Sequence, residues 1–346
     1  MKKKLTYKSS GVDIRAGDKA KDKIKKLARA TFTPGVLKGI GGFGGFFELK
    51  TKEYKEPVLL SSVDSVGTKL KVAFMMGKHD TVGEDIVNHC VNDILVHGAK
   101  PLFFLDYIGI GKLDPLVVTE IVKGLSKACR KAGCALVGGE TAELPDFYEK
   151  GEYDLAGCIV GVVEKKKIID GSSIRPGDLI IGLKSSGLHT NGYSLARKVL
   201  FNTARFNVNK PIDELKTTIG KELLKVHRCY APSILPVLNK FHIKGMAHIT
   251  GGGIQGNLCR ILPVNCDAQI HTNAWKVPAI FRLIQREGNI EEREMFKVFN
   301  MGIGLVLVVS KNEANRISAQ LSSLGEVVFS IGEITSGDGR VILEGV

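Results

Sequence analysis

The chain of 346 residues has an ordinary globular composition, with 44% hydrophobic and 25% charged residues, and it is long enough for about two domains that each bury a core. No apolar run approaches the roughly 18 residues of a membrane span. The lysines at 2–4 precede a polar segment, so the sequence predicts neither a membrane protein nor a secreted one. The seven cysteines are scattered without a C-x-x-C pair, which argues against a zinc ribbon or a disulfide framework and indicates reduced thiols in the cytoplasm.

The formal charge of +13 is concentrated at the start of the chain, where residues 1–30 contribute +8 of it. Ala20, Ile24, Leu27 and Ala28 recur at helical spacing, which predicts an amphipathic helix over residues 19–30 with a solvated lysine face. No RNA-recognition motif accompanies these lysines. Attraction of phosphorylated small molecules is the favoured interpretation, and a noncatalytic RNA-binding protein is the alternative from another functional class.

The apolar run at residues 58–60 predicts a buried strand that breaks into a polar loop over residues 61–69. In this loop Asp64 can hold a hard cation, Gly67 lets backbone N–H groups approach phosphate oxygens, and Lys69 supplies a positive charge. A polar turn in which Asp64 caps the next element explains the same residues. These residues alone leave both interpretations open.

A glycine-rich segment comes just before that strand. Gly39, Gly41 and Gly44 satisfy the pattern G-x-G-x-x-G, but a dinucleotide-binding fold needs a strand before it and a helix after it. Here a Thr-Pro-Gly turn precedes the pattern and the strand-like run FFELK follows it. The segment is therefore predicted to be a flexible glycine turn, either a phosphate flap or a hairpin.

Residues 83–98 have the wide apolar face of a helix, along which His89, Asp93 and His97 recur at every fourth position. A metal-binding row is one interpretation. Hydrogen-bonded histidines beside a functional Asp93 are the favoured one. The following strand, over residues 101–110, places Asp106 in a hydrophobic run, where an ionised carboxylate is costly unless it is paired or bound to a cation.

A helix is predicted over residues 114–132, since Asp114 is a suitable N-cap and proline follows it. The strand at residues 134–137 then ends in GGETAELP, a second carboxylate loop at a strand end. Glu140 of this loop could converge with Asp64 on one metal–phosphate cluster. Residues 154–164 form the last predicted strand of this half.

A polar linker with glycine and proline separates two predicted domains, residues 1–168 and residues 169–346. In the second domain His189 and Asn191 occupy a loop of small residues before a helix, where they are ligand contacts or parts of a helix cap. A glycine turn at residues 251–253 follows a predicted strand and opens a helix, which suits a phosphate monoester. Residues 299–305 are predicted to lead into a buried strand, with further strands over residues 327–334 and 340–343 and a helix over residues 312–324.

Taken together, these stretches resemble the AIR synthetase (phosphoribosylformylglycinamidine cyclo-ligase) family of purine biosynthesis, within the PurM-like ATP-binding superfamily. The segments that carry the resemblance run in order along essentially the whole chain: YKSSGVDI, GGFGG, DSVGTK, VNDI, PLFFLDY, GGETAELP, GLHTNGYSLAR, HITGGG and FNMGIG. Each segment is weak alone, and their common order is specific.

The resemblance implies an α/β (α+β) fold with two PurM-like domains, of which the N-terminal one has a mixed sheet with helices and pairs with a second copy in a homodimer. It implies that ATP drives the cyclisation of formylglycinamidine ribonucleotide to aminoimidazole ribonucleotide, releasing ADP and phosphate. The formyl amide oxygen would first be phosphorylated, and the ring-forming nitrogen would then displace the phosphate. ATP and Mg²⁺ are the implied cofactors, and a need for K⁺ is left open.

The resemblance also assigns roles to residues. The magnesium ligands are Asp64, Asp93 and Glu140, and the catalytic residues are Lys69, His189 and Asn191. The residues expected to contact ATP are Gly41, Gly42, Gly44, Gly45, Asp64, Gly67, Thr68, Lys69, Asn92, Asp93, Gly139, Glu140 and Thr141. The residues expected to contact the substrate are Asp106, Tyr107, His189, Asn191, Thr250, Gly251, Gly252 and Gly253.

Two positions depart from the family pattern: Ser65 and Asp146 both stand where glycine is common, and at Ser65 a positive φ would be strained because serine adds a Cβ. His89 and His97 are not part of the pattern, which favours their structural interpretation. Among related enzymes, a selenophosphate-forming one would need a cysteine before Cys90, and an amidating one a G-x-C-x-G nucleophile; neither occurs. A thiamine-phosphate kinase is the remaining enzyme alternative, although that family lacks GLHTNGYSLAR.

Overall fold

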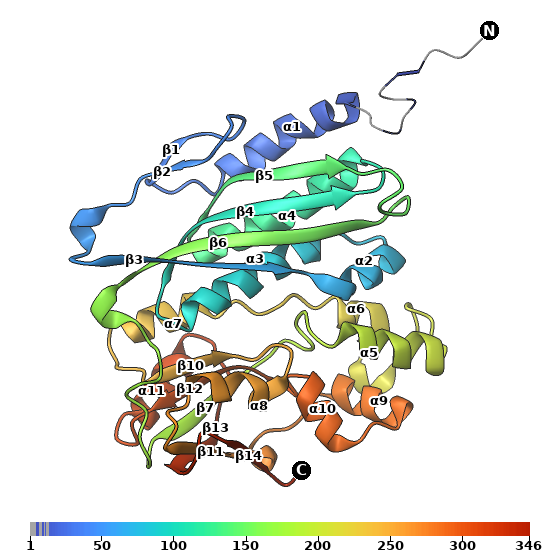
Figure 1. Ribbon diagram of the computed structural model, residues 1–346. Helices are drawn as coiled ribbons and strands as arrows, with labels where there is room; N and C mark the ends of the chain where they lie inside the picture. The colour runs from blue at the N-terminus through green and yellow to red at the C-terminus, as the bar shows by residue number, and fades with distance from the viewer. Residues whose placement is uncertain (1–4, 7–8, 10, 12–13) are drawn as a thin grey trace.

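The computed structural model describes residues 5–6, 9, 11 and 14–346, and it has two layered halves, one above the other in Figure 1. Most of the YKSSGVDI segment lies outside the described residues. No helix in the described part of the chain is long and apolar enough to cross a membrane. All strands of a four-stranded sheet lie before residue 165, and all strands of a six-stranded sheet lie after residue 178.

The N-terminal half is a four-stranded sheet in the order β3-β6-β4-β5, in which only the pair β4 and β5 is parallel. Helices α3 and α4 pack against one another and cover one face of this sheet (Figure 1). The elements of this half are α1 (Ile14–Arg29), β1 (Val36–Lys38), β2 (Phe46–Phe47), β3 (Pro57–Ser65), α2 (Leu70–Met76), α3 (Asp80–Leu95), β4 (Lys100–Ile110), α4 (Pro115–Ala132), β5 (Ala135–Glu143) and β6 (Tyr153–Glu164).

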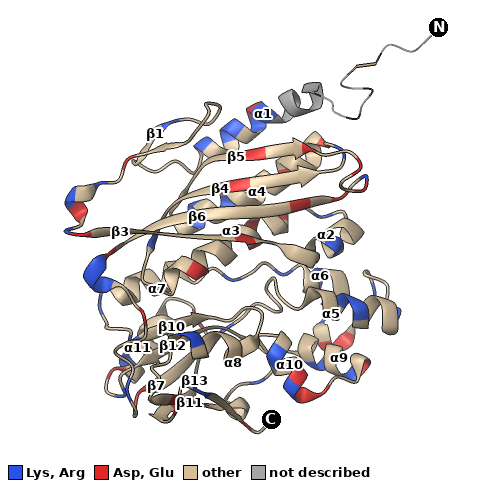
Figure 2. Ribbon diagram, viewed as in Figure 1, with Lys and Arg blue, Asp and Glu red and all other residues tan. Residues whose placement is uncertain are grey.

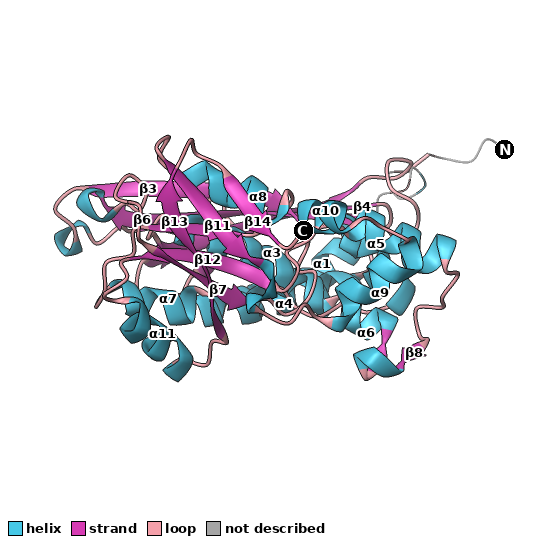
Figure 3. Ribbon diagram, turned by 90° about the horizontal axis from the view of Figure 1, so that it is seen from below, coloured by secondary structure: helices cyan, strands magenta, loops and turns pink. Residues whose placement is uncertain are grey.

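The C-terminal half is built on a six-stranded sheet in the order β10-β12-β7-β13-β11-β14. Seen from below, its strands lie side by side, while α5, α6 and α9 gather at one end of the molecule (Figure 3). Its elements are β7 (Leu179–Lys184), α5 (Tyr193–Arg197), β8 (Pro211–Ile212), β9 (Thr217–Thr218), α6 (Ile219–Leu223), α7 (Ala231–Leu238), β10 (Gly245–His248), α8 (Gly253–Leu258), β11 (Cys266–His271), α9 (Ala279–Gly288), α10 (Glu292–Val298), β12 (Ile303–Val309), α11 (Ala314–Ser323), β13 (Val328–Ser336) and β14 (Val341–Glu344).

Local signals fix the ends of several elements as predicted. The Asp114 side chain accepts a hydrogen bond from the Leu116 N–H, Pro115 occupies the first turn of α4, and Gly133 ends the helix with φ of 74°, a conformation that glycine adopts without strain. The predicted basic helix is α1, whose Ile24 and Leu27 pack against the core. Lys21, Lys23, Lys25 and Lys26 of this helix are exposed, and the described part of α1 is coloured blue at several positions in Figure 2.

The predicted strand ends were wrong at both carboxylate segments. β3 continues to Ser65, because residues 57–65 all pair with β6, including Asp64 opposite Gly157. β5 likewise continues to Glu143, paired with β4. Polar residues remain in these strands because neighbouring strands satisfy their backbone groups, so small and charged side chains alone do not end a strand.

The outer face of the N-terminal sheet is uncovered in a single chain. Leu59 and Val63 of β3 are 60% and 70% exposed, and Tyr107 of β4 is 38% exposed. Alternation along β3 turns the intervening residues toward the helices, which explains the regular change between exposed and half-buried positions. The other face is the one that carries the functional groups described below.

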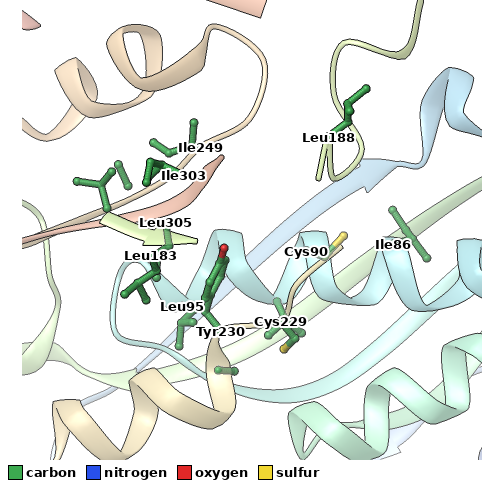
Figure 4. Close-up of a cluster of buried hydrophobic side chains, with 14 of the residues drawn as sticks. Ile86, Cys90, Leu95, Leu183, Leu188, Cys229, Tyr230, Ile249, Ile303 and Leu305 are labelled. Carbon is green, nitrogen blue, oxygen red and sulfur yellow. The ribbon is translucent and has the colours of Figure 1, made fainter. Parts of the chain in front are cut away.

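Helix α3 is buried on nearly all sides, because it lies between the N-terminal sheet and the C-terminal half. Apolar side chains of both halves form one continuous core, in which Leu95 of α3 lies beside Tyr230 and Leu183 (Figure 4). The polar residues of α3 are therefore buried where the two halves meet. This is why the helix combines a wide apolar face with buried Asp, Asn and His side chains.

Helices α3 and α4 cross closely at Gly124, so a larger side chain at this position should lower the stability of the fold. A Cβ added to Gly124 of α4 would lie 2.1 Å from the Asp80 carbonyl oxygen, so the two backbones would have to separate. We expect Gly124→Ala to lower the free energy of unfolding by about 1–3 kcal/mol, although alanine favours a helix by about 1 kcal/mol. Urea denaturation measures this change.

The control for this prediction is Gly256→Ala in α8, where the added Cβ would have no heavy atom of the described residues within 4 Å apart from the backbone of its own helix and its chain neighbours. That variant should be neutral or slightly more stable, since only helix propensity changes. Equal effects of the two substitutions would contradict the packing explanation.

Candidate active site

A cleft of about 390 Å³ lies between the two halves. β3 and α3 supply one wall, and β10, α8 and the turn between them supply the other. The polar groups that line it include Asp64, His89, Asp93 and His248, together with Thr250, Asn257 and Arg260. Carboxylates, imidazoles and a guanidinium therefore face one space, the arrangement expected of a site for a phosphorylated ligand and a cation.

Four side chains of this cleft form a chain of short contacts. His89 Nε2 lies 2.7 Å from Asp64 Oδ2 and 3.7 Å from Asp93 Oδ2. His248 Nδ1 lies 2.8 Å from Asp93 Oδ1. The structure thus brings Asp64 and Asp93 together, as predicted. It also places His89 between them, which the sequence analysis had set aside as structural.

The environment keeps both carboxylates ionised. Burial raises the pKa of Asp64, but the hydrogen bond from His89 and the one from the Ser65 N–H lower it by more. Burial likewise raises the pKa of Asp93, and its contact with His248 and the charge of His89 bring the net value below normal. Two carboxylates that are ionised at neutral pH face the cleft, and this charge suits a divalent cation.

A second layer of polar groups fixes the histidine rings. Thr190 Oγ1 lies 2.7 Å from His89 Nδ1 and 3.2 Å from His227 Nδ1. His227 Nε2 lies 3.0 Å from His248 Nε2. Thus both ring nitrogens of His89 and both of His248 have a polar partner, which holds the rings in place. His227 itself has 0% exposure and, because of burial first and of the neighbouring histidines second, a pKa well below normal.

His189 lies beneath this cluster and not at its surface, since it is only 1% exposed and its ring stacks on that of His227 with centroids 4.0 Å apart. Its Nε2 accepts a hydrogen bond from the Ser186 N–H, and its buried Nδ1 has no hydrogen-bond partner among the described residues. Burial, followed by the charges of neighbouring cations, lowers its pKa well below 6.5. His189 is therefore a neutral ring whose remaining N–H is available as a donor.

Lys69 differs from its predicted position beside a phosphate. It is 0% exposed, and its ammonium forms an ion pair with Asp85 Oδ2 at 2.8 Å. It also donates to the carbonyls of His189 at 3.1 Å and Lys225 at 2.7 Å. The ammonium thus joins α3 to two loops of the C-terminal half. The sequence did not reveal this, because Asp85 lies on a predicted apolar helix.

Asn92 also holds the two halves together. Its side chain donates to the Arg228 carbonyl at 2.8 Å and accepts from the Tyr230 N–H at 3.0 Å, and it is fully buried. Asn88 donates to the His227 carbonyl in the same way, at 2.7 Å. Asn92 was predicted to contact ATP. Its side-chain hydrogen bonds here are made to groups of the 227–230 segment.

The glycine turn at residues 251–253 lies in the chain between Thr250 and Asn257, which both line the cleft. Asn257 Nδ2 donates to the carbonyls of Gly251 and Gly253, at 3.2 and 2.8 Å, which fixes the turn. Asn191 lies close by, since a Cβ added to Gly251 would stand 3.6 Å from its Oδ1. The structure therefore brings the segments GLHTNGYS and HITGGG together, although they are some sixty residues apart.

Other predicted residues lie elsewhere in the chain. Glu140 is on β5, with β6 and β4 between it and Asp64, a separation of roughly 14 Å at the usual strand spacing. One ion cannot bind both carboxylates within a single chain. Gly139 and Thr141 are the neighbours of Glu140 on β5. The glycine turn of Gly41, Gly42, Gly44 and Gly45 joins β1 to β2, and Gly45 packs on Val137 of β5. This turn therefore belongs to a β1–β2 hairpin that lies beside β5, the edge strand of the N-terminal sheet.

Asp106 and Tyr107 occupy adjacent positions of β4 and point to opposite faces. Burial raises the pKa of Asp106 to about 7. The carboxyl group can therefore hold a proton near neutral pH, which avoids the cost of an ionised carboxylate in a hydrophobic run. Tyr107 lies on the uncovered face, opposite Glu140. Neither residue lines the cleft between the halves.

The backbone conformation and nearby contacts describe the remaining predicted residues and the two departures from the family pattern. Gly67 has φ of 68°, and the exposed Thr68 Oγ1 lies 3.1 Å from Ser194 Oγ. Ser65 does not adopt a positive φ, so serine is unstrained there, whereas Asp146 has φ of 66°. Asp is one of the few side chains that tolerate this conformation. The Nδ1–H of His97, which was set aside with His89, donates to the Ile169 carbonyl oxygen at 3.1 Å.

Comparisons with known proteins agree with this architecture. A family model described as "AIR synthase related protein, N-terminal domain" matches residues 52–163, and its C-terminal counterpart matches residues 175–344. A protein of Syntrophotalea carbinolica named phosphoribosylformylglycinamidine cyclo-ligase is 58% identical over 96% of this chain and 95% of its own length. One of the same name from Alkaliphilus metalliredigens is 52% identical over 98% of each chain.

Solved structures show the same fold at low identity. The thiamine-monophosphate kinase of Stenotrophomonas maltophilia covers 94% of this chain, with a TM-score of 0.70 and 15% identity. The hydrogenase maturation protein HypE of E. coli also covers 94%, with a TM-score of 0.67 and 17% identity. At this identity the likeness concerns the fold alone. The two domain matches and the relatives above 50% identity establish that the chain belongs to the AIR synthase related protein family.

Proposed function

We propose that this chain is an ATP-dependent ligase of purine biosynthesis that converts formylglycinamidine ribonucleotide into aminoimidazole ribonucleotide, ADP and phosphate. The observation that carries the proposal is the identity of 58% and 52%, over almost the full length of both partners, with relatives named for this reaction. The cleft supports it, because its carboxylates, its histidines and its arginine suit a reaction that needs positioning and charge neutralisation.

The residues of the cleft fit a magnesium ion bound with ATP. Asp64 and Asp93 are ionised, lie on either side of His89 and face the cleft, and carboxylate oxygens are the ligands that Mg²⁺ prefers. When bound, Mg²⁺ would neutralise the charge of the phosphates. Glu140 would join such a site only through another ion or a second copy of the chain, given its place on β5.

The substrate is proposed to occupy the C-terminal wall of the cleft. The Gly251–Gly253 turn and Thr250 would hold the ribose phosphate, with Arg260 supplying positive charge from the same cleft. Asn191, beside this turn, would contact the substrate. His189 would act from beneath, since its unpartnered Nδ1–H is a donor for an oxygen that gains charge. Lys69 would serve by holding the His189 carbonyl in position.

The chain is proposed to form a homodimer through its N-terminal sheet. The uncovered face of the N-terminal sheet, with Leu59, Val63 and Tyr107 exposed, supports a homodimer in which two such faces meet. The turn of Gly41–Gly45 and the β5 residues would reach ATP in that assembly. The two proposed domains comprise residues 1–168 and residues 169–346. Seven unpaired thiols favour a reducing compartment such as the cytoplasm, and K⁺ stays a candidate cofactor.

A single incubation tests this function. Purified protein, formylglycinamidine ribonucleotide, ATP and Mg²⁺ should give ADP and aminoimidazole ribonucleotide in equal amounts, since each cyclisation consumes one ATP. Both products are measured by chromatography, with protein lacking substrate as the control. ADP without the imidazole would mean an uncoupled or different phosphoryl transfer. Turnover of thiamine phosphate instead would overturn the proposal in favour of the kinase that shares this fold.

A further inference from the structure

We infer that Asn300, in the segment FNMGIG at residues 299–304, is a positioning residue that holds His189 in place for the reaction. The inference rests on the proposed function, because His189 is the neutral donor of that proposal. FNMGIG is one of the segments that carry the family resemblance, whereas the residues that line the cleft come from other segments. Asn300 is 3% exposed, so it can act on the cleft only through the groups that it contacts.

The Asn300 side chain ties its own turn to the loop that precedes His189. Its Nδ2 donates to the Gly187 carbonyl at 2.8 Å. Its Oδ1 accepts from the Ser185 hydroxyl at 3.0 Å and from the Gly302 N–H at 2.8 Å. The backbone repeats this link, since the Ser185 N–H donates to the Gly302 carbonyl at 2.8 Å. Both polar atoms of the amide thus have partners, and the amide fixes one loop against the other.

The loop held in this way has a backbone conformation that needs support from its surroundings. Gly187 has φ of 144° and His189 has φ of 60°, and the second value lies in the left-handed region, which is uncommon for residues other than glycine. Such a conformation persists only where the structure around it determines it. Lys69 supplies part of this support through its hydrogen bond to the His189 carbonyl at 3.1 Å, and Asn300 supplies it at Gly187.

The ring of His189 carries a donor that the fold leaves unmatched. The Ser186 N–H donates to Nε2 at 3.1 Å, so the proton of the neutral ring is on Nδ1, which is buried without a hydrogen-bond partner among the described residues. A buried donor without a partner opposes folding, so the ring stays in place only if its neighbours hold it. FNMGIG also leaves space for this ring, because a Cβ added to Gly304 would lie 2.5 Å from its Cε1. One segment thus sets the place of both the loop and the ring.

Loss of Asn300 should affect the rate of the reaction more than the binding of the substrate. A donor to an oxygen that gains charge acts in the transition state, and a displacement of about 1 Å can cost roughly 100-fold in rate. The Gly251–Gly253 turn, which is proposed to bind the ribose phosphate, is fixed by Asn257. This turn keeps its support when Asn300 is replaced, so KM should change little.

Steady-state kinetics of Asn300→Leu tests the inference, because leucine keeps the approximate size of the side chain and removes both polar atoms. We expect kcat to fall by about 100-fold, with the KM values for formylglycinamidine ribonucleotide and ATP within about threefold of wild type. The matched control is Thr31→Val in the N-terminal half. Thr31 is also buried, donates to the Ala28 carbonyl at 2.6 Å and accepts from the Leu136 N–H at 2.8 Å. Its replacement should lower the urea midpoint and leave kcat unchanged.

A milder variant keeps the test decisive if Asn300→Leu does not fold. Ser185→Ala removes one hydroxyl, which lies 3.0 Å from both Asn300 Oδ1 and the Gly187 carbonyl oxygen. Loss of this hydrogen bond should lower kcat by about tenfold, with the same unchanged KM values. Wild-type kcat in folded Asn300→Leu, or in Ser185→Ala if the first variant is unfolded, would overturn the inference. An equal loss of kcat in Thr31→Val would overturn it too, since the effect would then follow stability alone.

Spectroscopy of the free protein tests the same geometry without the reaction. In protein made with ¹⁵N-labelled histidine, the His189 ring, identified by its loss in His189→Gln, should show a protonated Nδ1 and a bare Nε2. Asn300→Leu should shift or broaden this signal, and Thr31→Val should leave it unchanged. An unchanged His189 signal in Asn300→Leu would overturn the inference even where the wild-type protein makes aminoimidazole ribonucleotide. Absence of that product from the wild-type protein would refute the proposed function, while the spectra would still decide whether Asn300 positions His189.

Discussion

Replacing Lys69 by methionine is expected to lower the free energy of unfolding by about 3–5 kcal/mol, because it leaves the buried Asp85 carboxylate without its counter-charge. Both side chains of this pair are fully buried, and the carbonyls of His189 and Lys225 lose their donor as well. Urea denaturation followed by circular dichroism measures the change. A protein this destabilised should also show a lower soluble yield.

The chain provides a matched control two residues away. Lys71 forms an ion pair with Glu152 at 2.5 Å, but its side chain is 42% exposed, so Lys71→Met should cost only about 0–1 kcal/mol. In the double variant Lys69→Met/Asp85→Asn no unpaired charge remains, and much of the lost stability should return. Wild-type stability in Lys69→Met, combined with loss of ATP binding, would instead support the phosphate contact predicted from the sequence.

Replacing Asp64 by asparagine is expected to lower kcat/KM by about three orders of magnitude while the protein stays folded. A metal ion that neutralises phosphate charge supplies several kcal/mol of transition-state stabilisation, and each 1.36 kcal/mol is about tenfold in rate. Asparagine can still accept from the Ser65 N–H, which lies 2.7 Å from Asp64 Oδ1. Steady-state rates at increasing Mg²⁺ concentration measure the loss.

The control for Asp64→Asn is Asp338→Asn, which removes a carboxylate from an exposed surface pair with Arg340. That variant should keep the wild-type rate. Turnover within about threefold of wild type in a folded Asp64→Asn protein would refute the metal assignment, since one order of magnitude already corresponds to more than 1 kcal/mol.

The sequence by itself determined the elements that depend on local signals. The N-cap at Asp114 with the proline after it located α4, and apolar runs located the strands of the N-terminal sheet without their ends, because these signals act between neighbours in the chain. The order of the family segments likewise pointed to the fold and to Asp64 and Asp93. It did not reveal where β3 and β5 end, because their last residues are held by pairing with strands far along the chain.

Only the tertiary structure decided which polar residues meet. His227 and His248 follow His89 by more than a hundred residues. His248 opens the segment HITGGG, but neither histidine's local sequence indicates that it contacts His89 or its neighbours. They join it because α3 is enclosed between the two halves, so that its polar residues must find partners across the interface. The same enclosure places Lys69 on Asp85 instead of at a surface, and the strand order keeps Glu140 away from Asp64. A residue's type could be read from the sequence, whereas its partner depended on long-range packing.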